Sequence, residues 1–441
     1  MSKRILWIGL FCLSLTSGLY ADSALEKQIS ADYEDYLKPL FIHFHKNPEL
    51  SLLEFKTAAR MADELRAAGF TVTEKVGGTG VVAMMENGDG PLVMMRADMD
   101  GLPVEEKSGL SYASTATQVD PITKNEVPVM HACGHDVHIT SLVGTARYMS
   151  ANKDKWSGTL MLLVQPAEER IMGARLMMQD NLWQRFGTPD YALAFHVGAQ
   201  LPSHAINVVG GSTYAGSDSV DIIVHGIGAH GASPHSGKDP IVLGSQIVLA
   251  LQTLISRELP PRDAGVITVG SFHSGTKHNI ISDRAHLQLT VRNTSLETRK
   301  LLLDGIERIA VNLGRAAGLP EDKLPEVIFS KESTPPTLND FDLADRLRTH
   351  WIGKFGEERV LSIRSKGMGA EDFPYFTTDP KIPSVYFAVG GTPLEKIEAA
   401  RNGGEPVPSH HSPLFKITPK PAVVTGTTAT IYALLDLMPA G

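Results

Sequence analysis

Hydrophobic residues recur along the chain with two periods, and their alternation predicts an α/β fold. Helical spacing of apolar residues predicts helices over 31–45, 55–68, 142–149, 341–355 and 421–437. Short apolar runs predict buried strands at 70–73, 80–85, 92–96, 159–165, 192–196 and 384–388. Polar residues follow several of these strands, and His196 is expected at the end of one. This order favours a sheet with a functional site along its carboxyl edge.

The middle of the chain has a different order of elements, which predicts a second domain inserted into the first. Alternating runs predict strands at 219–224, 266–272, 286–292 and 326–330, with long helices at 240–259 and 296–317. Strand, helix, two strands, helix and strand is the ferredoxin-like order. We therefore predict an inserted α+β domain at residues 214–327 and a first domain built from residues 22–213 and 328–441.

Residues 1–21 are predicted to be a secretory signal peptide. A basic start precedes an apolar run from Ile5 to Leu19, and cleavage is expected after Ala21. The run is shorter than the roughly 20 apolar residues that span a bilayer. A buried N-terminal helix is the alternative. We expect a periplasmic or secreted protein without stable membrane insertion once the signal is removed, and no later segment is expected to cross a membrane.

Length and charge narrow the class of protein further. A chain of 441 residues is long enough for two domains. The net charge is −8, and no dense run of Lys and Arg is present. Both features argue against nucleic acid as the main partner.

Cysteine and histidine usage points to metal ligation. Of the two cysteines, Cys12 lies in the predicted leader, so Cys133 has no partner for an intramolecular disulfide. Cys133 lies two residues before His135, and thiolate and imidazole both ligate zinc-like ions. Further candidate ligands follow strands or lie in Gly- and Pro-rich loops: Glu168, Glu169, His196, His410 and His411.

Each of these candidates has a plainer interpretation. His196 could be a structural histidine, the glutamate pair a solvated face, and the histidine pair a surface turn. Their joint placement favours a hydrolytic site in which two ions share a water molecule. Adjacent carboxylates point in different directions, so one glutamate can ligate metal while the other acts as general base.

Several motifs, in a fixed order, resemble one enzyme family. They are RADMDGLP (96–103), MHACGHDVH (130–138), QPAEE (165–169), AFHV (194–197), GIGAHGASP (226–234), GAEDF (369–373) and HSPLF (411–415). With these motifs the chain resembles the metal-dependent amidohydrolases that include hippurate hydrolase, N-acyl-amino-acid amidohydrolases and auxin-conjugate hydrolases, relatives of aminoacylase and carboxypeptidase G. The resemblance spans nearly the whole chain after the leader.

The resemblance implies a mixed-sheet peptidase domain with a dinuclear metal site and an inserted ferredoxin-like domain for dimerisation or for closure as a lid. It implies two divalent ions per subunit, which could be zinc, manganese, cobalt or nickel. Glu168 matches the catalytic base. The implied ligands are Cys133 as the bridge, with His135, Glu169, His196 and His411.

The resemblance also implies roles outside the ligand set. His230 matches a histidine that contacts the substrate carbonyl as it becomes tetrahedral. Asn279 and Arg292 match positions that could bind the carboxylate of the amino-acid half, although Arg292 could also form an ordinary surface ion pair. Acidic residues expected to support the ligands from an outer shell are Asp98, Asp100 and Asp136.

We therefore predict an exported, possibly homodimeric metal-dependent hydrolase. It would cleave hippurate-like or N-acetyl amino acids to an acid and an amino acid through a metal-activated water. The alternatives are a dipeptidase or carboxypeptidase on the same scaffold, Cys-His nucleophilic chemistry at Cys133, and a non-catalytic periplasmic protein that binds small ligands. Glu168 argues against the binding protein, because a binder does not need a spare carboxylate.

Overall fold

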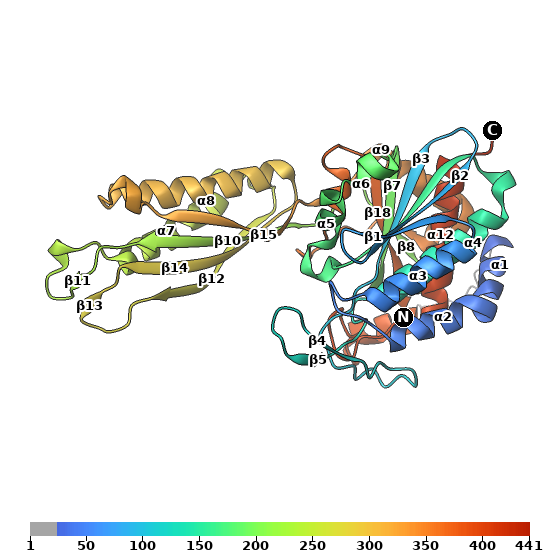
Figure 1. Cartoon of the computed structure of the whole chain (residues 1–441), viewed down its shortest axis with the longest axis horizontal. Helices are drawn as coiled ribbons and strands as arrows, with labels where there is room; N and C mark the ends of the chain where they lie inside the picture. The colour runs from blue at the N-terminus through green and yellow to red at the C-terminus, as the bar shows by residue number, and fades with distance from the viewer. Residues whose placement is uncertain (1–23) are drawn as a thin grey trace, which may run out of the picture.

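The computed structural model describes residues 24–441, so the predicted signal peptide lies outside the described residues. Figure 1 shows a large body built on an eight-stranded sheet and a slender second body that extends from it with a sheet of its own. The large body contains both ends of the described chain, and the second body is formed from the middle of the chain.

The large sheet is mixed, as predicted. Its order is β1 (Thr71–Val76), β2 (Gly80–Asn87), β6 (Gly158–Gln165), β3 (Leu92–Asp98), β7 (Tyr191–Pro202), β18 (Ser384–Thr392), β8 (Ile206–Asn207) and β17 (Val360–Leu361). The four central strands β6, β3, β7 and β18 run parallel. The pairs β1–β2, β2–β6 and β18–β8 are antiparallel. Parallel strands end at one edge, which places the residues after β3 and β6 side by side.

Helices cover both faces of this sheet, because alternate residues of its buried strands are apolar toward each side. One apolar cluster joins the sheet to α1 (Ala24–Asp32), α2 (Lys38–Lys46), α3 (Phe55–Ala67), α4 (His135–Ala151), α9 (Phe341–Phe355) and α12 (Pro419–Leu437). The opposite cluster joins it to α5 (Gly173–Gln179), α6 (Leu182–Phe186) and α10 (Pro374–Thr377). The short helix α11 (Leu394–Arg401) contacts β7.

Two elements near the predicted ligands differ from the sequence prediction. Helix α4 begins at His135, seven residues before the predicted start, because Gly134 adopts a left-handed φ of 88° and turns the chain into the helix. Strand β7 does not end at His196. It continues to Pro202, since Val197 and Gly198 pair with Val389 and Gly390 of β18. His196 therefore lies within a strand.

The second body is an antiparallel four-stranded sheet with two helices on one face. Its strand order is β12 (Gly265–Ser274), β14 (Arg284–Asn293), β10 (Gly216–His225) and β15 (Glu326–Thr334). The helices are α7 (Pro240–Thr253) and α8 (Leu296–Ala316), which share an apolar core with the sheet. The chain order of these elements is ferredoxin-like. Strand β15 continues past residue 327 to Thr334.

Short paired strands complete the structure. They are β4 (Thr117–Val119) with β5 (Glu126–Pro128), β9 (Gly211–Tyr214) with β16 (Thr337–Asn339), and β11 (Ala229–His230) with β13 (Ile280–Ile281). Figure 1 shows β11 and β13 at the end of the second body that is farthest from the large sheet. The pair β9–β16 lies where the chain enters and leaves the second body.

One segment is more apolar than the sequence reading expected. Residues 240–258, which comprise α7 and a following π-helical turn, are long and apolar enough to cross a membrane by length and composition, contrary to the prediction that no later segment would be. Within the structure this helix packs Leu243, Ile247 and Leu251 into the core of the second body. Its other side exposes Val242 and Leu249, the latter by 72%.

The centre of the large sheet contains a buried cation. Arg96 of β3 donates hydrogen bonds to Gln165 Oε1 at 2.7 Å, Asp98 Oδ2 at 2.7 Å and Glu371 Oε1 at 2.8 Å. All four side chains are buried. Buried carboxylates are stable only when they are paired, so Arg96 stabilises the edge where β3 and β6 end.

We expect Arg96→Met to destabilise the fold by about 3–5 kcal/mol, because Asp98 and Glu371 would remain buried without their cation. Urea denaturation followed by circular dichroism measures the loss. Arg66→Met is a matched control, because Arg66 pairs with Glu74 at the surface, and its midpoint should stay close to wild type. Equal midpoints for the two variants would show that Arg96 does not stabilise this edge.

Candidate active site

A cavity of about 460 Å³ lies at the carboxyl edge of the large sheet, where the second body joins it. Its lining includes most of the predicted ligands, the predicted base and Arg292: Cys133, Glu168, Glu169, His196, Arg292 and His411. These residues lie far apart in sequence. The structure therefore brings into one cavity residues that the sequence motifs could only nominate separately.

The loop before α4 positions Cys133 and His135. Gly134 lies between them, and a Cβ at that position would come within 2.4 Å of Val197 Cγ1, so the close approach of this loop to β7 requires glycine. Cys133 Sγ lies 3.3 Å from His196 Nε2. His135 uses Nδ1 to bond the Asp100 carbonyl at 2.8 Å, which leaves Nε2 pointing into the site.

The two glutamates follow β6 in a short 3-10 helix, Glu168–Arg170, that begins after Ala167 in a left-handed conformation. Glu168 Oε2 and Glu169 Oε1 lie 3.9 Å and 3.8 Å from His135 Nε2. His411 Nε2 lies 3.3 Å from the other oxygen of Glu169, Oε2. Glu169 thus lies close to both histidines, with one oxygen toward each, and Glu168 lies beside His135.

The cavity contains more buried acid than its cations neutralise. Burial raises the pKa of Glu168 well above its usual range, and the charges of Glu371 and Glu169 raise it further. Burial and the neighbouring Glu169 likewise raise the pKa of the Cys133 thiol. Burial would lower the pKa of His135, but Asp98 and Asp100 raise it to about 10. In this protein alone, the Cys133 thiol and the His135 imidazolium therefore retain protons that a bound cation could replace.

The arrangement of donor atoms fits such cations. Among the buried side-chain atoms of the described residues that have no hydrogen-bond partner, three belong to this site: His135 Nε2, Glu169 Oε1 and Asp100 Oδ1. Candidate ligand atoms form one group from Cys133, His135 and His196 and another from Cys133, Glu169 and His411. The two groups share Cys133. Thiolate, imidazole and carboxylate in such groups are the ligands that zinc-like ions accept.

The three predicted outer-shell aspartates occupy different places. Asp100 lies against His135 and accepts a hydrogen bond from Ser51 at 2.6 Å. Asp98 lies 3.6 Å from His135 Nε2 and is held by Arg96. Asp136 is buried, but its side chain accepts from His45 Nδ1 at 2.7 Å. Asp100 thus orients His135, whereas Asp136 connects α4 to α2.

The predicted substrate-binding residues separate into two groups. Arg292 lines the cavity, and its side chain forms no ion pair or hydrogen bond with the described part of the chain. His230 and Asn279 lie in and beside β11 and β13, at the far tip of the second body (Figure 1). Strand β10 has ten residues and runs from the cavity end of this sheet toward the tip, so it separates the two ends by about 33 Å. One chain therefore does not bring His230 or Asn279 to its own cavity.

Sequence reasoning assigned no role to three residues at this site. His138 donates from Nδ1 to Asp98 at 2.5 Å and accepts from the Val197 amide at 2.9 Å, and burial lowers its pKa to about 3. Glu371 and Tyr214 both line the cavity. The signals were present, since His138 follows His135 by one helical turn and Glu371 belongs to the GAEDF motif.

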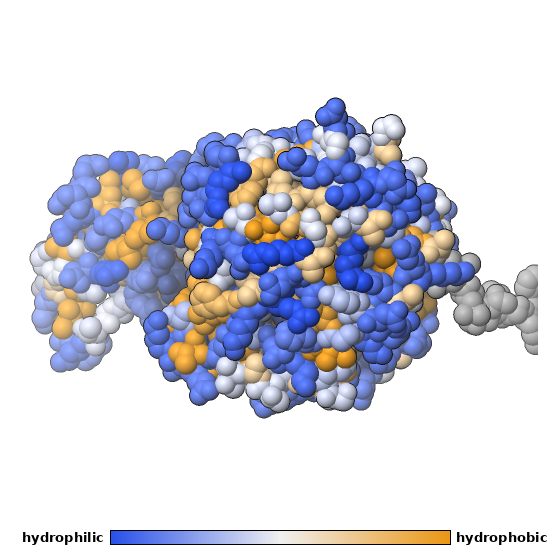
Figure 2. Space-filling view, turned by 45° about the vertical axis from the view of Figure 1, so that its right-hand side comes forward, coloured by the Kyte–Doolittle hydropathy of each residue, from blue (hydrophilic) through white to orange (hydrophobic). Residues whose placement is uncertain are grey.

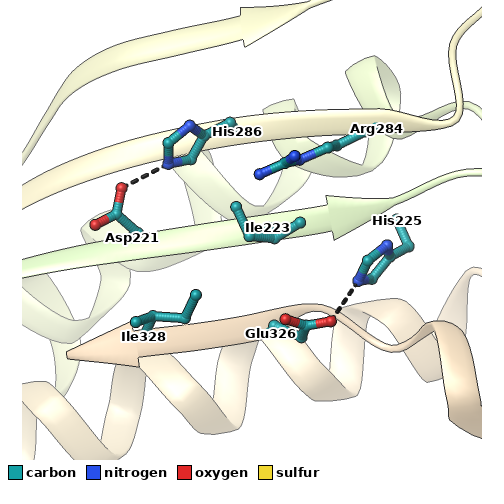
Figure 3. Close-up of a pocket in the computed structure, with 7 residues that line it drawn as sticks. All are labelled: Asp221, Ile223, His225, Arg284, His286, Glu326 and Ile328. Atoms are coloured by element: carbon teal, nitrogen blue, oxygen red, sulfur yellow. Dashed lines mark hydrogen bonds and ion pairs between the residues drawn. The ribbon is translucent and has the colours of Figure 1, made fainter.

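A second cavity of about 410 Å³ lies on the second body, on the sheet face opposite its helices (Figure 3). Two ion pairs flank it: His286 with Asp221 at 2.5 Å and His225 with Glu326 at 2.8 Å. Ile223 and Ile328 lie between them, and none of the predicted site residues lines this cavity. This cavity is open to solvent. Its lining lacks buried side-chain atoms without a hydrogen-bond partner, which the first cavity has.

Comparison with known proteins agrees with this geometry. Residues 94–402 match the family described as peptidase family M20/M25/M40. The chain is 35% identical to a hippurate hydrolase of Campylobacter jejuni, covering 75% of this chain and 82% of the relative. It is also 35% identical to thermostable carboxypeptidase 2 of Saccharolobus solfataricus, covering 81% and 86% of the two chains.

Solved structures share the fold. A dinuclear metal-binding peptidase of the M20 family from Bacillus subtilis superposes with a TM-score of 0.71 at 25% identity, covering 92% of this chain and 98% of that one. The family match covers more than half of the chain and includes the cavity residues from Cys133 to Glu371, whereas His410 and His411 lie beyond it. The chain therefore belongs to peptidase family M20/M25/M40 and is a metal-dependent hydrolase of the amidohydrolase and peptidase type.

Proposed function

We propose that this protein hydrolyses N-acyl amino acids to a carboxylic acid and an amino acid. The observation that carries the proposal is the placement of Glu168, a buried carboxylate that stands beside two ligand groups without being needed by either. Relatives named hippurate hydrolase and N-acetyl-L-cysteine deacetylase support the substrate class. Arg292 in the same cavity offers a cation for the free carboxylate of the amino-acid half.

Two divalent ions would be held by the two groups that share Cys133, namely Cys133 with His135 and His196, and Cys133 with Glu169 and His411. Zinc, manganese, cobalt and nickel all accept these ligands. When bound, the ions would polarise the amide carbonyl and make water nucleophilic at neutral pH.

Glu168 moves the proton in this scheme. Its carboxylate accepts a proton from the attacking water and returns it to the leaving nitrogen, which departs as an amine. The charges of Glu371 and Glu169 raise its pKa and so favour both the uptake and the retention of that proton until the amine leaves. Asp100 holds His135 in one tautomer throughout.

The rival readings are weaker on physical grounds. Burial raises the pKa of Cys133, which disfavours a free thiolate nucleophile. A binding protein would not need Glu168. A dipeptidase or carboxypeptidase on the same scaffold remains the alternative, because a relative named carboxypeptidase is as similar as the hippurate hydrolase.

A substrate comparison tests the proposal. We expect the metal-loaded protein to release glycine from N-acetylglycine or N-benzoylglycine with a kcat/KM at least about tenfold above that for glycylglycine. The carboxylates that line the cavity are the proposed base Glu168, the proposed ligand Glu169 and Glu371, which pairs with Arg96, so none is left for a free α-ammonium group once the metals are bound. Amine release measured by ninhydrin or mass spectrometry gives both rates. A reversed ratio would assign the protein to the dipeptidases instead.

We expect Glu168→Gln to lower kcat by about 10²- to 10⁴-fold, the usual contribution of a general base. Metal content measured by mass spectrometry should stay at two ions per subunit, since Glu168 belongs to neither ligand group that shares Cys133. Glu405→Gln, an exposed change, serves as the control. Near-normal turnover in Glu168→Gln would remove Glu168 from the role of base.

We further propose a homodimer in which the tip of one second body reaches the cavity of the partner subunit. Helix α7 exposes apolar Ile241, Val242 and Leu249, and the neighbouring β12 is an edge strand that pairs with β14 on one side and with no described strand on the other. Figure 2 shows apolar side chains gathered on the surface of this body. A second copy could cover both features, and it would carry His230 and Asn279 away from their own cavity toward the other.

Subunit mixing tests the dimer. We expect His230→Ala and Glu168→Gln homodimers to be inactive, whereas their one-to-one mixture should recover about a quarter of wild-type activity, because half the dimers would contain one complete site. His235→Ala, a nearby exposed change, is the control and should stay active. Mixed dimers that form in size-exclusion chromatography but stay inactive would rule out the contribution in trans.

We also propose that the protein is exported. The basic and apolar start of the chain supports delivery to the periplasm or beyond, after which Cys133 is the single thiol. Its burial at 9% exposure would protect it from oxidation there.

A further inference from the structure

The turn that presents the proposed base is strained at both ends. Ala167 and Ile171 flank the 3-10 helix Glu168–Arg170, and their φ angles of 47° and 53° lie in the left-handed region. That region is unfavourable for residues with a Cβ, and most of all for a β-branched residue such as isoleucine. Backbone strain of this kind persists only where the surrounding structure fixes it, so other segments must hold this turn.

Two carboxylates from other segments hold the backbone on either side of the base. The Glu169 amide, which follows Glu168, donates to Asp100 Oδ2 at 3.1 Å. The Ala167 amide, which precedes Glu168, donates to Glu54 Oε1 at 2.8 Å. Asp100 already belongs to the site through His135. Glu54 does not line the catalytic cavity, so its contact with the base turn comes from behind.

Glu54 makes this contact instead of a local one. It occupies the N-cap position of α3, where a side chain commonly accepts a hydrogen bond from the first turn of the helix. The Glu54 side chain makes no such bond. Glu49 accepts from the first turn in its place, with the Thr57 amide 2.7 Å from Glu49 Oε2. The Glu54 carboxylate is therefore directed away from its own helix and toward the turn after β6.

The second oxygen of Glu54 is fixed as well. Oε2 accepts from the Thr79 hydroxyl at 2.6 Å, in the turn between β1 and β2. Glu54 is fully buried, and no cation of the described residues pairs with it. Burial and the charge of Asp100 raise its pKa to about 7. A buried carboxyl group without a cation is stable only when it is hydrogen-bonded, and the two oxygens of Glu54 connect the β1–β2 turn to the base turn.

We propose that Glu54 is a positioning residue for Glu168: it holds the Ala167 amide, and the strained turn then directs the base into the cavity. The inference rests on the proposed function, in which Glu168 moves the proton, and adds a residue outside the cavity that determines where the base lies. Without Glu54 the turn would relax toward ordinary backbone angles and displace the Glu168 carboxylate. The two ligand groups that share Cys133 do not include Glu54 and would keep their atoms.

The first test compares Glu54→Ala with Glu54→Gln in the metal-loaded full chain. We expect Glu54→Ala to lower kcat by about 10- to 100-fold and to keep KM within about threefold, because displacing a catalytic group by about 1 Å has effects of that size. Metal content measured by mass spectrometry should stay at that of the wild type. Glu54→Gln should recover most of the lost kcat, since its amide oxygen can still accept from the Ala167 amide.

Glu49→Ala is the matched control. It removes another buried carboxylate from the start of α3 but not the contact with the base turn. The control should lower the midpoint of urea denaturation and keep the wild-type kcat. Thr79→Val removes only the hydroxyl that fixes Glu54 Oε2, so it should lower kcat in the same direction as Glu54→Ala. This variant tests the inference even if Glu54→Ala does not fold.

Hydrogen–deuterium exchange tests the inference without turnover. Amides in the peptide that covers residues 166–174 should exchange at least about fivefold faster in Glu54→Ala than in wild type, because the turn opens locally. Peptides from β6 should keep their wild-type rates, and Glu54→Gln should resemble wild type throughout.

Two results would overturn the inference: wild-type kcat together with unchanged exchange in a folded Glu54→Ala protein, or an equal loss of kcat in Glu49→Ala. The second result would assign the effect to the start of α3. If Glu168→Gln retains near-normal turnover, the proposed role of Glu168 fails instead, and the exchange rates alone then decide whether Glu54 holds the turn. If the wild type cleaves dipeptides rather than N-acyl amino acids, the same comparison is made with a dipeptide.

Discussion

Arg96 is the cation on which the carboxyl edge of the large sheet depends. Four carboxyl groups lie buried close to one another at this edge: Asp98, Glu371, Asp372 and Glu168. The repulsion between their negative charges disfavours ionisation. Arg96 bonds Asp98 and Glu371 directly and lies 3.7 Å from Asp372. Glu168 instead lies 3.9 Å from His135 Nε2. Burial and the charge of Glu371 raise the pKa of both Glu168 and Asp372 well above the usual range.

The unequal contacts of Arg96 explain how neighbouring carboxylates take different roles. Burial opposes the ionisation of Asp98. Its pairing with Arg96 and His138 nevertheless holds its pKa well below the usual range. Burial and Glu371 instead raise the pKa of Glu168. The pKa values of these two buried carboxylates are therefore shifted in opposite directions because their neighbours differ, and such a difference separates acid from base roles.

Much of this organisation could be predicted from the sequence, because it depends on local pattern. The helix expected at 55–68 is α3, and the strands expected at 80–85 and 159–165 are β2 and β6. The five candidate ligands converge since their motifs follow parallel strands or lie in loops at one edge. The length of β7 could not be predicted, because it is set by pairing with β18, which lies almost two hundred residues later.

Other features escaped prediction for the same reason. The lowered pKa of His138 depends on groups that are distant in sequence. The contact of Asp136 with His45 does so as well. The position of His230 depends on the length of the antiparallel ladder between β10 and β14, which keeps the tip away from the cavity. A motif can identify such a residue by type, but only the path of the chain decides which subunit's cavity it can serve.

The entry into the second body connects that path to the catalytic cavity. Tyr214 ends β9, and Ser217, which also lines the catalytic cavity, is already part of β10. Tyr214, which lines the catalytic cavity, therefore lies two residues before the first strand of the second body on one continuous backbone. A rotation of the second body about this segment would move Tyr214 relative to His196 and Tyr386, which belong to the large sheet. The segment that leads to the distant tip thus also positions a wall of the catalytic cavity.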